Sequence, residues 1–368
     1  MRIVLLTGIY PPEIGGTATY AEALATGLLT LGHEVKVVTY GRSEERQEGQ
    51  KRQERYEVAS VSRVGNVLSR WMRYAKMIRK HATDADMIIA LSSVSVGIPL
   101  MFAGLKKPKK ILRLGGDFFW ERATDGGSML SLRAWYASTW GEWRIINTAL
   151  MEAILSSFDL LVYSTKFQQE IHEKAFKKLP ERVVIENASS TSPIPARPSP
   201  QHVPLRLLFL GRFVGFKNLF ILLDAVASMP DVTLTLVGSG PLEQKLRAHA
   251  RCLALESRVL FLPPVTGREK QDIFGEHDLL VIPSVTEISP NVALEAVSAG
   301  LPVLLTEETG YRSKMSSLLI IKPLRTSEQI VVAVREVMHY MPVSSQITCL
   351  RNWGTVAEEW IAFLTSLS

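Results

Sequence analysis

The same order of structural elements is encoded twice along the 368-residue chain, and this repetition constrains the fold more than any other feature. Near the N-terminus, an apolar run over 2–6 leads into a glycine-containing loop, a helical pattern follows, and 35–39 is apolar again. This order predicts a βαβ unit, in which a helix connects two parallel strands. It restarts at residue 205, where "LRLLFLG" leads through a helical pattern over 219–227 to "VTLTLVG". We therefore expect an α/β protein with two Rossmann-like, doubly wound domains of comparable size.

The predicted boundary between the domains is the segment "SSTSPIPARPSPQHVP" at 189–204, which is rich in proline and serine. Such a composition is typical of an extended linker. We predict an N-terminal domain over 1–190, a linker over 191–204 and a C-terminal domain over 205–351. Doubly wound domains bind ligands at the carboxyl ends of their strands. The two domains are therefore expected to face each other across a ligand-binding cleft.

The positive charge of the chain is concentrated in one part of the predicted N-terminal domain. The formal net charge is +6, and the eleven Lys or Arg from Arg63 to Arg113 are accompanied by only two acidic residues, Asp84 and Asp86. This surplus predicts a basic face with an anionic partner. No nucleic-acid recognition motif accompanies the charge. We therefore expect no nucleic acid as partner and favour anionic lipid.

Within this basic region, the segment 66–82 has the pattern of an amphipathic helix. Leu68, Trp71 and Met72 are among the apolar residues of one side, whereas Arg and Lys favour the other side. Two interpretations stay open. The apolar side either covers the sheet, as in an ordinary surface helix, or contacts the headgroup region of an anionic membrane.

Cysteine content and apolar segments bear on the compartment. Cys252 and Cys349 are far apart in the sequence, so they predict neither a disulfide framework nor a metal site. The N-terminal apolar run is too short for a secretory signal, and no segment approaches the ~18 consecutive apolar residues of a membrane span. We expect a cytoplasmic protein, either free or associated with the inner face of the membrane.

The most informative stretch is "PSVTEISPNVALEAVSAGLPV" at 283–303. The strand predicted before it delivers Glu287 to the ligand-binding edge of the second domain. Ser289 is a suitable N-cap and Pro290 a suitable first helical residue. The backbone amides from Asn291 onward then form the N-terminus of a helix, which is a ready site for phosphate.

Glu295 lies in the second turn of the same helix, between apolar neighbours. An unpaired carboxylate among apolar residues is costly, so we favour a function over an ordinary solvated position. We predict that Glu295 accepts hydrogen bonds from hydroxyl groups, as acidic residues do for the ribose in nucleotide-binding folds.

Two cations follow the first strand of the second domain, in "GRFVGFKN". Arg212 comes directly after the strand end, and Lys217 is five residues further on. Arg offers a bidentate fork and Lys a mobile point charge, so together they are suited to neutralise a diphosphate. The signal gains weight because the predicted phosphate-binding helix belongs to the same domain.

The first domain offers two weaker candidates at its own ligand-binding edge. In "ILRLGGDFFWER", Asp117 follows a strand and two glycines, where a carboxylate can orient or deprotonate a sugar hydroxyl, although Asp after Gly-Gly is also ordinary turn chemistry. Gly15 and Gly16 follow the first strand, where bare backbone can approach a ligand closely. These glycines equally fit a tight turn with no ligand.

Other patterns are set aside. The aspartates of "DAD" at 84–86 precede a strand and therefore fall at the opposite edge of the sheet, so we reject them as a metal site. The GxGxxG fingerprint of dinucleotide-binding enzymes is missing from the glycine-rich turns, which argues against an NAD-dependent dehydrogenase. The scattered histidines have no ligand spacing, and we interpret them as surface or core residues.

Taken together, these motifs resemble the retaining GT-B glycosyltransferases of glycosyltransferase family 4, also called group 1. The resemblance covers nearly the whole chain, from "YPPEIGGTATYAEALATGLLTLGHEVKVVT" through "FLGRFVGFKN" and "VGSGPLEQKL" to "PSVTEISPNVALEAVSAGLPV". The final "NWGTVAEEWIAFL" is similar to a tail helix that crosses back onto the N-terminal domain, here over 352–368.

The resemblance implies roles for the residues already singled out. Glu287 and Glu295 match an E-x7-E pattern, in which the first glutamate lies by the donor sugar and the second holds the ribose. Arg212 and Lys217 match the diphosphate-binding pair. Further positions match donor-binding segments: Asn291 and Val292 for the amides that meet the phosphates, Val265 for the backbone near the base, and Gly15 and Gly16 for a loop facing the donor.

Two departures from the family pattern concern the sugar. Ile288, Ser289 and Pro290 stand where many members carry Gly-Phe-Gly, which is expected to reshape the sugar pocket. Asp117 stands near the position where many members carry a histidine, so we expect it to take over that residue's contact to the sugar.

The activity implied is transfer of a sugar from a UDP-, GDP- or ADP-sugar to a saccharide or lipid-linked acceptor, with retention at the anomeric carbon. No metal or other cofactor is expected, because cations and helix amides can neutralise the leaving diphosphate. Surface polysaccharide or glycolipid assembly is the favoured setting. Alternatives are a sugar-nucleotide epimerase or a phosphorylase of the same architecture, or a nucleotide-sugar-binding protein without turnover.

Overall fold

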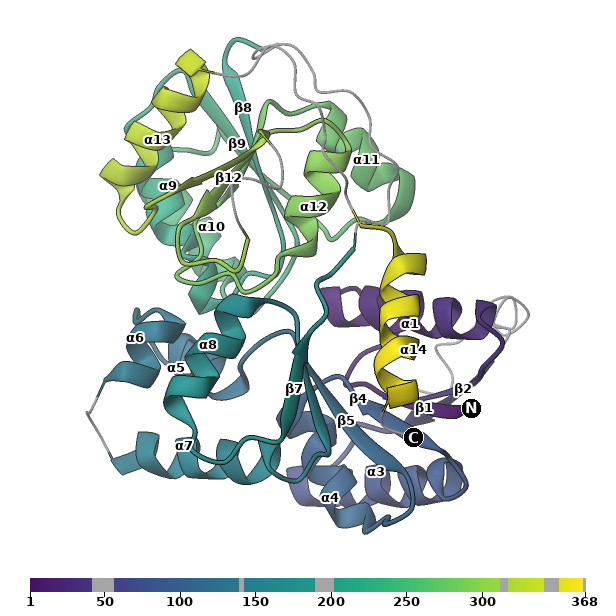
Figure 1. Cartoon of the computed structure of the whole chain (residues 1–368). Coiled ribbons are helices and arrows are strands. Elements are labelled where there is room, and N and C mark those ends of the chain that lie inside the picture. The colour runs from purple at the N-terminus through teal and green to yellow at the C-terminus, as the bar shows by residue number, and fades with distance from the viewer. Residues whose placement is uncertain (42–55, 139–141, 189–201, 312–316, 341–350, 367–368) are drawn as a thin grey trace. The chain divides into compact units, whose positions relative to one another are not determined.

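The computed structural model describes residues 1–41, 56–138, 142–188, 202–311, 317–340 and 351–366, and these residues group into two compact units. Unit 1 comprises Met1–Phe118, Ala137–Asn187 and Asn352–Ser368, and unit 2 comprises Phe119–Tyr136 and Ala188–Arg351. Each unit is built around one parallel sheet with helices on it (Figure 1). The predicted pair of Rossmann-like α/β folds is confirmed.

Unit 1 contains a seven-stranded sheet in the order β3-β2-β1-β4-β5-β6-β7. Its strands are β1 (Arg2–Leu6), β2 (Glu34–Tyr40), β3 (Glu57–Val61), β4 (Met87–Ala90), β5 (Lys109–Leu114), β6 (Leu160–Tyr163) and β7 (Glu181–Val184). Its helices are α1 (Gly16–Thr30), α3 (Val67–Ala82), the π-helical turn η1 (Ser93–Gly97), α4 (Ile98–Ala103), α7 (Glu142–Leu155), α8 (Lys166–Ala175) and α14 (Trp353–Ser366).

Unit 2 contains a six-stranded sheet in the order β10-β9-β8-β11-β12-β13. Its strands are β8 (Leu205–Leu210), β9 (Val232–Val237), β10 (Val259–Leu262), β11 (Leu279–Ile282), β12 (Val303–Thr306) and β13 (Leu319–Lys322). Its helices are α5 (Phe118–Asp125), α6 (Leu132–Ala137), the 3₁₀ turn η2 (Gly215–Lys217), α9 (Leu219–Ala227), α10 (Glu243–Cys252), α11 (Gly267–Gly275), α12 (Asn291–Ser298) and α13 (Ser327–Tyr340).

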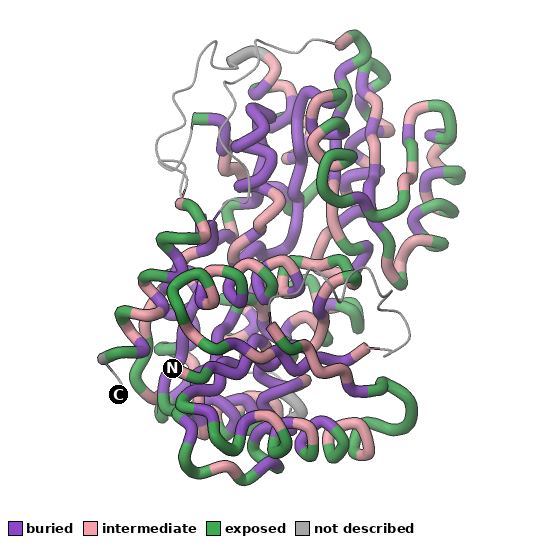
Figure 2. The backbone as a smooth tube through the Cα atoms, turned by 90° about the vertical axis from the view of Figure 1, so that its right-hand side faces the viewer, coloured by how far each residue is buried: buried purple, intermediate pink, exposed green. Residues whose placement is uncertain are grey.

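Burial of the strands explains their sequences. Parallel sheets have both faces covered, so their central strands, such as β4 and β11, are continuously apolar rather than alternating. In β8, Leu207 packs into one apolar cluster and Leu208 into another, because successive side chains point to opposite faces. Figure 2 shows the central strand segments of each unit as buried, whereas many helices alternate between buried and exposed positions.

The C-terminal helix α14 packs on α1 within unit 1 (Figure 1). The indole of Trp360 is fully buried and donates a hydrogen bond to the hydroxyl of Tyr20 at 2.8 Å. The helices approach closely at Gly27, where an added Cβ would lie 2.7 Å from the Cβ of Ala357. The chain thus returns to the first unit after completing the second, as the predicted crossing helix requires.

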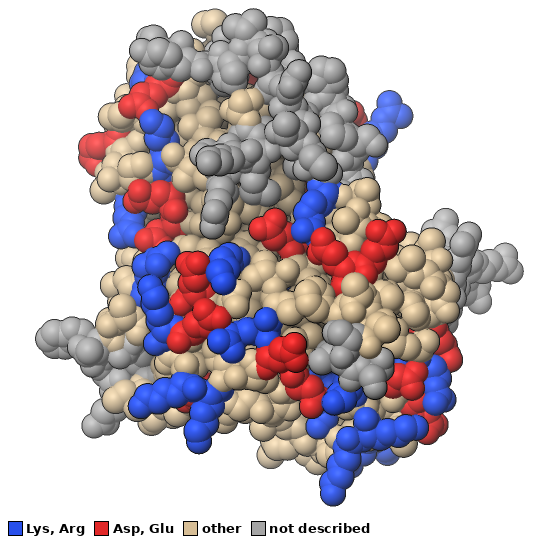
Figure 3. Space-filling model, viewed as in Figure 1, with Lys and Arg blue, Asp and Glu red and all other residues tan. Residues whose placement is uncertain are grey.

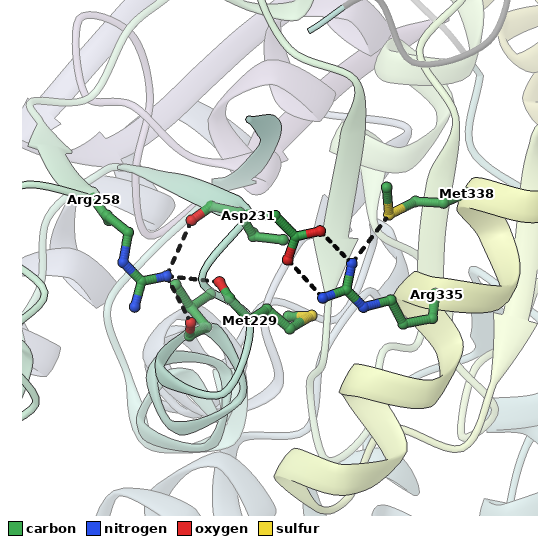
Figure 4. A network of polar contacts seen from close by, with 7 residues as sticks. Met229, Asp231, Arg258, Arg335 and Met338 are labelled. Atoms are coloured by element: carbon green, nitrogen blue, oxygen red, sulfur yellow. Dashed lines mark hydrogen bonds and ion pairs between the residues drawn. The ribbon is translucent and has the colours of Figure 1, made fainter. Parts of the chain in front are cut away.

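Figure 4 shows a polar network at the amino edge of the unit 2 sheet. The guanidinium of Arg335, from α13, holds both carboxylate oxygens of Asp231 at 2.5 and 2.6 Å, and these hydrogen bonds lower the pKa of Asp231. Arg258 donates to three backbone carbonyls between α9 and β9, the shortest contact being 2.7 Å to Met229. These contacts tie α13 and β10 to the segment between α9 and β9 at this edge of the sheet.

The grouping of the chain departs from a continuous first domain over 1–190. The contacts of Phe119–Tyr136 place it with unit 2, although both flanking segments belong to unit 1. The predicted linker lies largely outside the described residues, which resume at His202. Sequence composition cannot reveal such an exchange, because the segment has no proline-rich boundary of its own.

The helix predicted over 66–82 is α3, with Asn66 as its N-cap. Its buried face is formed by Tyr74, Ala75, Ile78 and Ala82, whereas Leu68 and Met72 are 60% and 50% exposed. The idea that all the apolar positions face the sheet is therefore wrong for Leu68 and Met72. They lie on a stripe beside the buried face, and the sequence pattern did not distinguish this stripe from the buried face.

Candidate functional site

The loops that follow β8, β10, β11 and β12 meet at one edge of the unit 2 sheet, because all its strands are parallel. Two of these loops are joined by a hydrogen bond from the amide of Val285 to the carbonyl of Phe216 at 2.8 Å. Another links the loops after β11 and β12, from the amide of Glu287 to the carbonyl of Glu308 at 2.8 Å. These bonds give the edge a defined backbone frame.

Lys217 and Glu287 form an ion pair at the centre of this frame. Their side chains are 14% and 8% exposed, and the hydroxyl of Ser284 donates to the same carboxylate oxygen of Glu287 at 2.7 Å. The ammonium group of Lys217 also lies 4.8 Å from the centre of the Phe216 ring. A largely desolvated ion pair at a strand edge can exchange partners when an anionic ligand arrives, because the ammonium attracts phosphate as well as carboxylate.

The local backbone places Lys217 accurately. Lys217 ends the 3₁₀ turn η2, and Asn218 follows with a left-handed φ of 57°. Asn tolerates this conformation better than most residues, and its buried side chain donates to the carbonyl of Leu324 at 3.4 Å. The turn then passes into α9, so Lys217 sits on a sharp corner between two regular elements.

Helix α12 begins beside the ion pair, one residue later than predicted. Asn291 is its first residue and Pro290 occupies the cap position, so the assignment of Ser289 as N-cap and Pro290 as first helical residue is wrong. The Ser289 hydroxyl instead contacts the hydroxyl of Tyr311 at 3.1 Å. Proline has no side-chain acceptor, and the first amides of a helix have no intrahelical partner. The amide of Ala293 already donates to the carbonyl of Pro290 at 3.0 Å, and the binding of phosphate by the amides of Asn291 and Val292 stays a prediction.

Glu295 is paired with a residue that the sequence did not point to. Its carboxylate lies 2.7 Å from the ammonium group of Lys270, and the two side chains are 10% and 20% exposed. Lys270 belongs to α11, which follows Val265 in the chain. The cost of the partly buried carboxylate is therefore offset by a cation. The side chain of Val265 packs into the core, which leaves only its backbone to contact a ligand.

Arg212 lies directly after β8 and is exposed. It shares the loop with Lys217 but does not share its burial. The structure thus brings Lys217, Glu287, Glu295 and the start of α12 to one edge, with Arg212 at the solvent side of the same loop.

The corresponding edge of unit 1 has a different character. Asp117 follows β5, and its carboxylate lies 3.3 Å from Nε2 of His172 on α8. Nδ1 of the same imidazole lies 3.2 Å from the hydroxyl of Tyr163, and burial raises the pKa of that hydroxyl well above its usual range. The side chains of Asp117 and His172 are both fully buried. The predicted contact between Asp117 and a sugar hydroxyl stays a prediction, since the carboxylate faces the imidazole here.

Gly15 and Gly16 lie at the start of α1 in unit 1. A Cβ added at Gly15 would meet only Cδ1 of Ile9, at 2.8 Å, and the end of that flexible side chain can shift aside, so packing alone does not require a glycine there. Gly15 and Gly16 belong to unit 1, whereas the other predicted donor-binding residues belong to unit 2.

Several partners escaped sequence reasoning: Ser284, Lys270, Tyr311, His172 and Tyr163. Ser284 is only three residues before Glu287 in the loop after the strand, so the sequence could have predicted that the two side chains lie close together. Lys270 and His172 meet their carboxylate partners across 25 and 55 residues of sequence, and no spacing rule links them.

Within the described ranges, no cluster of three or more His, Cys, Asp or Glu side chains is arranged to hold a metal ion. In the same ranges, no helix is long and apolar enough to cross a membrane.

Two protein families match the chain in succession. The model for "Glycosyltransferase Family 4" matches residues 14–188, and that for "Glycosyl transferases group 1" matches residues 204–339. An uncharacterized glycosyltransferase from Methanocaldococcus jannaschii is 26% identical over 84% of this chain and 81% of its own. Glycogen synthase from Mycobacterium tuberculosis is 25% identical over 84% of this chain and 78% of its own.

Solved structures resemble the whole chain. Sucrose-phosphate synthase from Thermosynechococcus elongatus has a TM-score of 0.72 at 15% identity, covering 100% of this chain and 97% of its own. Anabaena HepE in complex with UDP and glucose has a TM-score of 0.73 at 16% identity, covering 100% of both chains. These likenesses and the two parallel-sheet units define the GT-B fold. With the two family matches, they identify the chain as a glycosyltransferase of this fold.

Proposed function

We propose that the chain is a retaining glycosyltransferase of family 4 that transfers a sugar from a nucleoside diphosphate sugar to a saccharide or lipid-linked acceptor. The observation that carries the proposal is the ion pair of Lys217 and Glu287 beside the start of α12. A diphosphate needs cations and amide donors, and both converge at this edge. Glu295, in the second turn of α12, is proposed to accept hydrogen bonds from the ribose.

In this proposal, Lys217 changes partner during the reaction. Before donor binding, its ammonium group is held by Glu287. When the bond between sugar and diphosphate breaks, negative charge grows on the leaving oxygen, and Lys217, Arg212 and the α12 amides are the groups available to stabilise it. Interactions that strengthen as this charge develops raise the rate rather than only the affinity. Glu287, freed from part of its pairing, is proposed to face the positive charge that develops on the donor sugar.

We propose that this neutralisation proceeds without a metal ion, because the protein supplies the cations itself. The nucleotide found in HepE is UDP, and UDP, GDP and ADP are all candidates for this chain. Asp117 keeps its proposed role at the unit 1 edge, with His172 holding its carboxylate in place. Gly15, Gly16, Val265, Ser289 and Asn291 complete the proposed donor-binding set.

A thermal-shift panel tests the proposal directly. UDP, GDP and ADP and their glucose or mannose derivatives are added with and without EDTA. Binding at a hundredfold excess over Kd stabilises the folded protein by about 2.7 kcal/mol, so one base series should raise the melting temperature in the presence of the chelator. No shift with any of these nucleotides or sugar nucleotides would contradict the proposal.

The bound donor then separates the alternatives. Turnover that needs a sugar acceptor and keeps the anomeric configuration, read by NMR of the product, supports the retaining transferase. An epimerase converts the donor without acceptor, a phosphorylase requires inorganic phosphate, and a binding protein shows a shift but no product.

Surface polysaccharide or glycolipid assembly in the cytoplasm, at the membrane face, is proposed as the setting because unit 1 has a basic surface with exposed apolar residues. Leu68 and Met72 of α3 are joined by Met101 and Phe102 of α4, which are 44% and 42% exposed. The two helices are tied together by Arg79, whose Nε donates to the carbonyl of Ala103 at 2.7 Å. Figure 3 shows Lys and Arg side chains over this part of unit 1. Apolar residues beside basic ones suit binding to anionic lipid.

Cosedimentation with liposomes containing anionic lipid tests this surface. The protein should be retained at low salt and released as salt screens the attraction. The double variant Leu68→Ser, Met72→Ser should lose retention, whereas Val332→Ser, which alters an equally exposed apolar residue of α13, should keep it. Failure of the unaltered protein to bind would contradict the membrane proposal and leave the donor site untouched.

A further inference from the structure

The segment Phe119–Tyr136 belongs to unit 2 although it lies between two segments of unit 1 in the sequence. It contains most of α5 and α6, joined by a turn. Trp120 anchors it: the indole is 2% exposed and donates to the carbonyl of Leu130 at 2.9 Å, which closes the segment on itself. The segment is thus a folded element, and the proposed donor chemistry assigns nothing to it.

One end of this segment contacts the loop that carries Lys217. The carboxylate of Asp125 accepts a hydrogen bond from the amide of Gly215 at 3.3 Å. The ring of Trp120 lies 5.3 Å from that of Phe216. A Cβ added at Gly215 would come within 2.4 Å of the carbonyl oxygen of Thr124. Such a contact is far below normal packing distance, so the two backbones meet where only glycine fits.

The other end contacts the loop that carries Glu287. The amide of Leu132 donates to the hydroxyl of Thr286 at 3.0 Å, and both residues are buried. Thr286 immediately precedes Glu287. The amide of Leu132 would lose its acceptor if this hydroxyl were removed, and an unsatisfied buried amide is costly.

Both members of the ion pair are therefore carried by loops that rest on the same short segment. We propose that Phe119–Tyr136 is a positioning element for the donor: it fixes the Lys217 and Glu287 loops at the spacing that the sugar diphosphate requires. Thr286, Gly215 and Asp125 act as positioning residues, because they reach the donor only through Lys217 and Glu287. This inference rests on the proposed function and names the segment that sets the affinity for the donor.

Substitutions at the two contacts make the inference testable. Thr286→Val keeps the side-chain shape but removes the acceptor for the Leu132 amide. For the nucleoside diphosphate that binds the unaltered protein, this variant should bind about tenfold more weakly. The donor KM should rise by a similar factor, and the acceptor KM should stay unchanged. Thr286→Ser retains the hydroxyl and should restore both values.

Two further variants guard against a general loss of stability. Thr233→Val removes a hydroxyl that donates to the carbonyl of Leu205 at 3.3 Å in the same unit, so it is a matched control and should leave the affinity unchanged. Asp125→Ala alters an exposed residue and should fold normally, with an affinity about threefold weaker.

Affinities are measured by calorimetry well below each variant's melting temperature. Unchanged affinity in both Thr286→Val and Asp125→Ala would overturn the inference, as would an equal loss in Thr233→Val. If the unaltered protein bound none of UDP, GDP and ADP, the proposed function itself would fail, which is a separate result.

Discussion

The two units share a fold, yet the carboxyl edges of their sheets are built differently. In unit 2, Lys217–Glu287 and Lys270–Glu295 are ion pairs whose side chains keep between 8% and 20% of their exposure. In unit 1, the side chains of Asp117 and His172 are fully buried. Charges at the unit 2 edge can exchange partners with a ligand, whereas the unit 1 carboxylate is already enclosed.

This difference shows how one architecture supports two tasks. The Lys217–Glu287 pair is largely desolvated, so opening it is favourable only when a ligand phosphate replaces the carboxylate as the partner of the ammonium group. A buried carboxylate and imidazole cannot separate without leaving a polar group unsatisfied. The unit 2 edge is therefore suited to bind and release a charged donor, and the unit 1 edge to hold a fixed geometry.

The largest expected effect is the loss of Lys217. Replacing it by Ala removes a charge-assisted contact worth about 2–3 kcal/mol, so the Kd for the nucleoside diphosphate should rise about 30- to 150-fold. Calorimetric titration measures the change. Lys245→Ala, which removes an exposed cation from α10 of the same unit, serves as control. A Kd unaltered by the Lys217 substitution would remove the basis for calling the unit 2 edge the donor site.

The opposite behaviour is expected for Asp117→Asn in unit 1. The amide keeps the size of the side chain but weakens the contact with His172, so the protein should lose about 1–3 kcal/mol of stability. Calorimetric melting should show this as a drop of several degrees, at about 2–4 °C per kcal/mol. The affinity for the nucleoside diphosphate should stay unchanged. A large loss of affinity without any loss of stability would mean that the two edges are not divided as described.

A smaller effect is expected at the ribose end of the unit 2 edge. Glu295→Gln removes a charged acceptor and should weaken binding of the ribonucleotide by about tenfold. The same substitution should hardly affect binding of the 2′-deoxy nucleotide, because that ligand lacks the hydroxyl that would donate a hydrogen bond to the carboxylate. Comparing the two ligands in both proteins separates a ribose contact from a structural role. Equal losses for both nucleotides would show that Glu295 only pairs with Lys270.

Sequence patterns predicted the regular elements well where burial dominates. The apolar run over 2–6 is β1, and the helix expected over 219–227 is α9 with the same bounds. Continuous apolar strands and a glycine-terminated turn are local signals, so a single sequence is enough to read them. Glu287 was expected at the strand edge for the same reason, and the structure places it there.

The parts that sequence patterns missed depend on contacts between distant residues. Helix α12 begins at Asn291 rather than at Pro290, and the Ser289 hydroxyl contacts Tyr311, 22 residues away in sequence. The partners Lys270 and His172 are fixed by how helices pack on their sheets. The assignment of Phe119–Tyr136 to unit 2 depends on the buried Trp120 and on a backbone contact that requires glycine at position 215. None of these has a periodic or compositional signature.

Hydrogen–deuterium exchange with the nucleoside diphosphate identified by thermal shift tests the central claim most directly. The ligand should slow exchange at the start of α12, over 291–293, and in the Lys217 loop over 214–217, while α8 of unit 1 exchanges as before. Protection confined to unit 1, with the start of α12 unchanged at saturating ligand, would contradict a donor site at the unit 2 edge.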